Sequence, residues 1–121
     1  MTLKVNNDAN VNTYKLIKQD SSVASAADVN VTGDSGEMLS LEISNGGSTH
    51  TSYVKFKLTS GTVTTGTTEP DLMLSCGPNT AERYDFPNGL GFSQLTFWST
   101  RLPATSDTTA PNTTIVTILT Q

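Results

Sequence analysis

The side chains that most often carry out chemistry are scarce in this chain of 121 residues. His50 is the one histidine and Cys76 the one cysteine, and they stand in a polar loop and an apolar run respectively. Nucleophilic catalysis needs a nucleophile, a base and a group that orients the base, and no G-x-S-x-G turn supplies the nucleophile. We therefore expect His50 to be a solvated loop residue, Cys76 to be a small buried hydrophobic residue, and no intrachain disulfide to form.

The spacing of the His, Cys, Asp and Glu residues gives little support for metal binding or for catalysis by a pair of carboxylates. A zinc site needs three or four His, Cys or carboxylate ligands. The segment Asp28–Gly33 matches the start of a calcium loop, but the twelfth position is Leu39, where a bidentate glutamate is required. The eleven acidic residues lie mostly beside turn residues, and no glycosidase-like pair stands out. We expect no enzyme, no cofactor and no metal, with carboxylate-only chemistry as the one catalytic alternative left open.

The charge pattern argues against a nucleic-acid partner, and the lack of a long apolar run argues against a membrane span. The formal net charge is −4, and the Lys and Arg residues are scattered instead of clustered to neutralise phosphates. Lys55 and Lys57 share one face of a predicted strand, which we expect to be solvated. No apolar run approaches the length of a transmembrane helix, and the N-terminal residues lack the apolar region of a secretory signal. The sequence therefore predicts a soluble protein made in a cytoplasm.

Residues alternate between apolar and polar in several separate runs, which is the signature of half-buried strands. Thr and Ser together make up more than a quarter of the chain, which also favours strands over helices. The sequence predicts one all-β domain over residues 1–121, an antiparallel, jelly-roll-like β-sandwich with seven to eight short strands. The expected strands are Thr13–Lys18, Asp28–Val31, Met38–Ser44, Ser52–Thr59, Leu72–Cys76, Glu82–Phe86, Gln94–Thr100 and Thr113–Leu119. The expected core residues are Leu39, Leu41, Ile43, Val54, Phe56, Leu58, Leu72, Leu74, Leu95, Phe97, Val116 and Ile118.

The segments between these strands carry turn and loop chemistry. Asn45-Gly46-Gly47 and Pro87-Asn88-Gly89 predict turns, because Asn and Gly tolerate positive φ cheaply. Residues 19–27 are small and polar and fit a loop or a helical turn, of which we expect the loop. The Thr/Gly-rich stretch Ser60–Glu69 is also expected to be a loop. Residues 1–12 are polar, with few apolar anchors, and predict an extended arm that orders against something else.

Four stretches resemble a group of small structural proteins of tailed-phage virions. They are Y-V-K-F-K-L (Tyr53–Leu58), T-V-T-T-G-T-T-E-P (Thr62–Pro70), D-F-P-N-G-L-G-F-S (Asp85–Ser93) and R-L-P-A-T-S-D-T-T-A-P (Arg101–Pro111). The resemblance covers roughly Tyr53–Leu119 and rests on turn and strand patterns. It implies a compact β-sandwich that binds the outside of an icosahedral head as a cement or decoration subunit, commonly as a trimer. The chain departs from the group by ending in Thr120-Gln121, where related chains often end in an aromatic residue.

The resemblance implies a non-enzymatic protein of the virion surface, made in the host cytoplasm, with the major capsid protein as its partner. We expect the subunit or capsid contacts to include Leu3, Val5, Phe86, Leu90, Phe92, Trp98 and Arg101. Two alternatives stay open. One is a carbohydrate-binding module in which Trp98, Tyr53 and Tyr84 form a platform that stacks on a glycan. The other is a structural subunit of a tail or pilus-like assembly.

Overall fold

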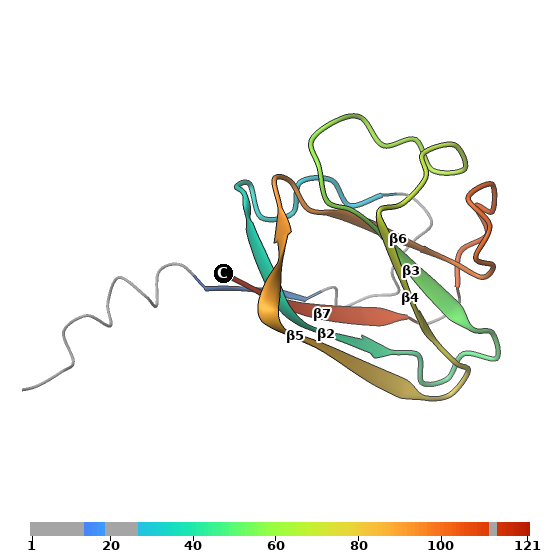
Figure 1. Ribbon diagram of the computed structural model, residues 1–121. Coiled ribbons are helices and arrows are strands. Elements are labelled where there is room, and N and C mark those ends of the chain that lie inside the picture. The colour runs from blue at the N-terminus through green and yellow to red at the C-terminus, as the bar shows by residue number, and fades with distance from the viewer. Residues whose placement is uncertain (1–13, 19–26, 112–113) are drawn as a thin grey trace, which may run out of the picture.

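The structure is a computed structural model that describes residues 14–18, 27–111 and 114–121. Within these ranges it contains strands but no helix (Figure 1). The seven strands are β1 (Lys15–Lys18), β2 (Gly36–Ser44), β3 (Ser52–Lys57), β4 (Leu72–Cys76), β5 (Ala81–Phe92), β6 (Thr96–Thr100) and β7 (Ile115–Thr120). The predicted all-β fold of short strands is confirmed.

The strands form two antiparallel sheets that face one another as a β-sandwich. The four-stranded sheet has the order β1-β7-β2-β5, and the three-stranded sheet has the order β4-β3-β6. Figure 1 shows the four-stranded sheet below the three-stranded one. Both sheets pair strands that are distant in sequence, since β7 lies between β1 and β2, and β6 pairs with β3. Closing loops of this length costs conformational entropy, and burial of the apolar core between the sheets offsets that cost.

The core lies between the two sheets and is built from the alternating runs. Its fully buried members include Leu41, Ile43, Val54, Phe56, Leu95, Phe97, Val116 and Ile118, all of which the sequence predicts. Leu58, Leu72 and Leu74, also predicted, are half-buried against this core. The rings of Phe56 and Phe97 lie 6.1 Å apart between centroids in a tilted arrangement. Each fully buried side chain of this size stabilises the fold by about 1.5–3 kcal/mol relative to exposure.

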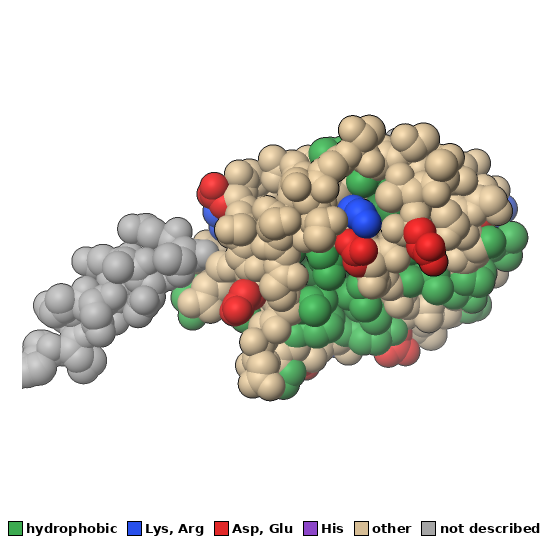
Figure 2. Space-filling model, turned by 45° about the horizontal axis from the view of Figure 1, so that its top comes forward, with side chains coloured by type: hydrophobic (Ala, Val, Ile, Leu, Met, Phe, Trp, Pro, Cys, Tyr) green, Lys and Arg blue, Asp and Glu red, His purple; other side chains and the backbone are tan. Residues whose placement is uncertain are grey.

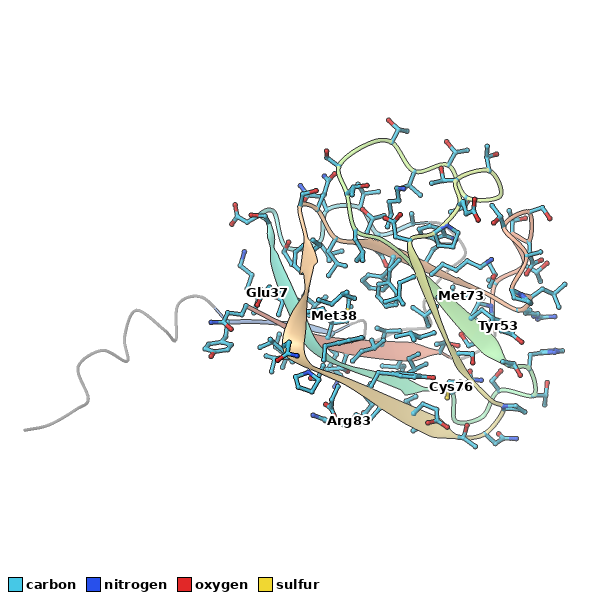
Figure 3. The ribbon with its side chains drawn as sticks, viewed as in Figure 1. Glu37, Met38, Tyr53, Met73, Cys76 and Arg83 are labelled. Carbon is cyan, nitrogen blue, oxygen red and sulfur yellow. The ribbon has the colours of Figure 1, made fainter. Side chains whose placement is uncertain are left out.

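A bulge in β2 changes which residues face the core. Met38 pairs with Thr120 and Ser40 pairs with Leu119, so Leu39 is an extra residue opposite two consecutive residues of β7. One extra residue reverses the alternation on one side of the bulge. Met38 is therefore fully buried and lies between the sheets, while Leu39 is half-buried (Figure 3). The predicted core position of Leu39 is wrong, and Met38 takes its place.

Strand β5 continues through Pro87-Asn88-Gly89, where the sequence predicts a turn after a short strand Glu82–Phe86. Met38 pairs with Leu90 and Ser40 with Asp85, so residues 86–89 form a bulge opposite Leu39. Gly89 takes a φ of +76°, which glycine adopts at little cost. Among the described strands β5 pairs with β2 alone, so Pro87 lies on an edge strand and removes no second ladder bond. The turn residues bend an edge strand instead of ending it.

The remaining differences are smaller. β1 contributes Ile17 to the core while Leu16 is exposed, and Asp28–Val31 forms a single bridge, from Asp28 to Phe97, instead of a strand. The predicted turn at Asn45-Gly46-Gly47 is present, with Gly47 at a φ of +82°. The predicted arm at 1–12 and all but the last residue of the predicted loop 19–27 lie outside the described residues. Within the described part of the chain, no helix has the length and apolar character needed to cross a membrane.

Candidate functional site

Two loops lie beside the three-stranded sheet, and one of them reaches over its outer face, the face turned away from the core. Residues 101–111 follow β6, and residues 60–69 connect β3 to β4. The loops touch: a Cβ added to Gly66 would lie 2.8 Å from Thr108 Cγ2. Gly66 also has a φ of +89°, so glycine suits this contact for two reasons.

Lys55 and Trp98 are neighbours on this outer face, in β3 and β6, and both are buried. The prediction that Lys55 is solvated is therefore wrong, because alternation in a strand says which side a residue faces but not what covers that side. The Lys55 ammonium donates a hydrogen bond of 2.7 Å to the carbonyl of Ala104 in the 101–111 loop. Burial lowers the pKa of Lys55 below its usual 10.5, and the carboxylate of Asp107 opposes part of that shift.

Asp107 organises the 101–111 loop from within. One carboxylate oxygen accepts a hydrogen bond from the Leu102 amide (3.0 Å) and the other from the Thr109 amide (3.3 Å). Partial burial alone would raise the pKa of Asp107, but these amides and the nearby Lys55 lower it. Arg101 closes the base of the loop, since its Nε donates to the carbonyl of Ala110 at 3.0 Å.

Asn45 fixes a second loop, residues 45–51 between β2 and β3, and is itself fully buried. Its Nδ2 donates to the carbonyls of His50 (2.8 Å), Gly77 (2.9 Å) and Cys76 (3.2 Å). Its Oδ1 accepts a hydrogen bond of 2.9 Å from the hydroxyl of Thr114. The sequence identified Asn45 only as a turn residue, and its role in joining three chain segments has no signal in the local pattern.

The two fixed loops border an open hollow of about 450 Å³. Its lining residues come from three segments and are His50, Thr51, Tyr53, Arg101, Leu102, Asp107 and Thr109. Figure 3 labels Tyr53 on β3, on the side of the molecule where the 101–111 loop lies. The hollow therefore combines a phenol, an imidazole, a guanidinium, a carboxylate and two hydroxyls with one apolar side chain. The sequence suggests Tyr53 and Arg101 as contact residues, but nothing in it predicts that they lie beside His50 and Asp107.

The two residues considered for nucleophilic chemistry lie in the settings that the sequence predicts. His50 is exposed on its loop, and Cys76 is buried at the end of β4. The Cys76 thiol lies 3.3 Å from the carbonyl of Thr80 and 3.5 Å from that of Ile43. In the described ranges no three His, Cys, Asp or Glu side chains gather in a way that could hold a metal ion.

The residues predicted to form subunit or capsid contacts occupy different positions. Phe86 and Leu90 are half-buried on β5, and Arg101 is partly exposed beside the hollow. Phe92 and Trp98 are 6% and 1% exposed, so they have almost no surface to offer a neighbouring subunit. Leu3 and Val5 lie outside the described residues.

Half-buried apolar residues lie where the edge strands β4 and β5 approach each other from the two sheets. This β4–β5 seam consists of Leu72, Leu74, Tyr84, Phe86 and Leu90. Tyr84 bridges the sheets by donating a hydrogen bond of 2.6 Å to the carbonyl of Ser75. Figure 2 shows hydrophobic side chains gathered on one face of the molecule, with acidic side chains around them.

The three aromatic residues of the predicted glycan platform are not brought together. Trp98 is buried on the outer face of its sheet, Tyr84 bridges the sheets at the seam, and Tyr53 lines the hollow. Stacking on a sugar requires an exposed ring face, which Trp98 lacks.

Comparison with known proteins adds no relative. No family model, curated protein or solved structure matches the chain.

Proposed function

We propose that this chain is a non-enzymatic structural protein of a virion, a cement or decoration subunit that binds the outside of an icosahedral phage capsid. In this proposal it assembles as a homotrimer and its partner is the major capsid protein. The observation that carries the proposal is the β4–β5 seam, where Phe86 and Leu90 are only partly buried on a strand that is at the edge of its sheet among the described strands. Both residues belong to the stretch that resembles the phage proteins.

The seam offers two kinds of contact to a neighbouring protein. Its apolar side chains would be removed from water by a partner, which favours association in proportion to the area covered. No strand of the described ranges pairs with the outer edge of β5, and the backbone groups there can pair with an added strand. The bulge at residues 86–89 and the charged pair Arg83–Asp85 on the same strand disfavour unselective edge pairing. A surface of this type fits a specific and repeated assembly contact.

Stabilisation of a shell follows from mass action. A subunit that binds the assembled shell but not its free subunits shifts the equilibrium toward the shell. Modest contacts become effective when a trimer engages several capsid sites at once, because the second and third contacts form at high effective concentration. The proposal therefore needs a rigid fold and several modest surfaces.

Co-sedimentation with expanded phage heads tests the proposal. We expect binding that saturates at a fixed copy number and raises the melting temperature of the heads. Light scattering at micromolar concentration should give a trimeric mass. A monomeric mass would contradict the trimer, and absence of head binding together with incorporation into tails or pili would favour the other structural class.

Two variants test the seam itself. Phe86→Ser removes apolar surface, and Asn88→Arg adds bulk and charge to the exposed bulge without removing a core side chain. Each is expected to weaken assembly or head binding about tenfold or more, which corresponds to about 1.4 kcal/mol. Val29→Thr changes an exposed apolar residue away from the seam and serves as the matched control. Full binding by both seam variants, with circular dichroism unchanged, would exclude the seam as the contact.

A further inference from the structure

We propose that the hollow beside the 101–111 loop binds one neutral sugar unit of a glycan. This inference goes beyond the proposed capsid role and does not depend on it. It places sugar recognition on a different set of residues from the aromatic platform that the sequence suggests, because Trp98 is buried.

The walls of the hollow are fixed before any ligand arrives. Asn45 holds the 45–51 loop through its hydrogen bonds to His50, Cys76 and Gly77. On the other side, Asp107 accepts hydrogen bonds from the amides of Leu102 and Thr109. Lys55 donates a hydrogen bond from the sheet to the carbonyl of Ala104 in the same loop. A site with fixed walls loses less conformational entropy on binding, so it recognises small ligands with few contacts.

The mixture of groups in the lining selects the ligand class. Tyr53 and Thr51 carry hydroxyls that donate and accept, and the Thr109 hydroxyl donates to Asp107 and can still accept. A carboxylate such as Asp107 has about four acceptor sites, of which two backbone amides and the Thr109 hydroxyl use three, so one remains for a ligand. The hydroxyls of a sugar ring likewise donate and accept, so they match such a lining. The phenol ring of Tyr53 and the exposed side chain of Leu102 supply apolar surface for the C–H groups of the ring.

Charge and size restrict the class further. The guanidinium of Arg101 and the carboxylate of Asp107 both line the hollow, so their formal charges cancel and a neutral ligand is favoured over an anion or a cation. The volume of about 450 Å³ falls in the range of small-molecule sites, which is about 300–1,000 Å³. The hollow is open to solvent, which allows the rest of a glycan chain to leave it.

The test titrates the isotope-labelled full chain with the methyl glycosides of glucose, galactose, mannose and N-acetylglucosamine, followed by amide chemical shifts. At least one glycoside is expected to shift amides of residues 50–53 and 101–109, with a Kd of about 1–10 mM, as small-ligand efficiency limits imply. Inorganic phosphate forms a separate arm. Shifts at these residues from phosphate alone would overturn the proposal in favour of an anion site.

Substitutions of residues that line the hollow test whether the glycoside binds there. Tyr53→Phe and Thr51→Val each remove a hydroxyl while keeping shape, and each should weaken the responding glycoside about threefold or more. Tyr14→Phe removes an exposed phenol hydroxyl outside the hollow and should leave the Kd unchanged. The inference is refuted by the absence of shifts up to about 50 mM glycoside, or by equal Kd values for wild type and both lining variants.

Discussion

Replacing Lys55 with methionine removes a buried ammonium while keeping an unbranched side chain of similar length beneath the 101–111 loop. Lys55 is fully buried, and its ammonium has the Ala104 carbonyl as its hydrogen-bond acceptor. Losing that bond costs about 1.5–3 kcal/mol, since one partner is charged. In the other direction, desolvating the charged ammonium on folding costs several kcal/mol before its hydrogen bond and nearby charges compensate, and Lys55→Met removes that cost. Ala104 is exposed, so water can solvate its carbonyl. We expect Lys55→Met to change the free energy of unfolding by less than about 1 kcal/mol.

Lys55→Ala is the matched variant, because it removes the stem as well as the charge. Three buried methylenes are lost at about 0.8 kcal/mol each, which gives about 2.4 kcal/mol before any penalty for the cavity. The two variants should therefore differ by about 2 kcal/mol, or roughly 8 °C in Tm for a domain of this size. Trp98, the one tryptophan, pairs with Lys55 across β3 and β6, so its fluorescence reports unfolding at this position.

The pH dependence provides a second readout with a definite sign. Because burial lowers the pKa of Lys55 in the folded state, the unfolded state binds more protons between that lowered pKa and 10.5. The contribution of Lys55 to stability therefore rises as pH increases through this alkaline window, and Lys55→Met removes the rise. Equal destabilisation by methionine and alanine, or an unchanged alkaline profile in Lys55→Met, would show that the stem packing and buried charge have been misjudged.

Three further predictions concern other parts of the fold. Asn45→Ala should lower the free energy of unfolding by about 2–4 kcal/mol in urea denaturation, because it removes the buried hydrogen bonds that join Asn45 to three carbonyls and to the Thr114 hydroxyl; an effect below about 1 kcal/mol would contradict the role of Asn45. Gly89→Ala should cost more in Tm than Gly33→Ala, since both have φ near +77° but an added Cβ meets the Glu37 side chain only at Gly89; equal costs would mean that Glu37 moves aside freely. Deleting Met1–Asn10 should leave the circular dichroism spectrum and Tm unchanged and weaken head binding, because this stretch is too poor in apolar residues to belong to the core; unfolding, or undiminished binding, would show that it has another role.

The amino-acid sequence by itself determined the fold class and most of the core. A strand pleat has a period of two, so the alternation around Leu41, Val54 and Ile118 identifies inward-facing residues without knowledge of their partners. The same local logic placed the turn at Asn45-Gly46-Gly47, because positive φ is a property of single residues.

The tertiary structure alone decided what depends on partners distant in sequence. The bulge at Leu39 arises from simultaneous pairing with β5 and β7, and the burial of Lys55 arises from a loop about fifty residues further along the chain. The hollow likewise joins His50 and Tyr53 to Arg101 and Asp107, which no local pattern connects. Periodicity specifies the side of a sheet that a residue faces, whereas the cover over that side is set by the path of the whole chain.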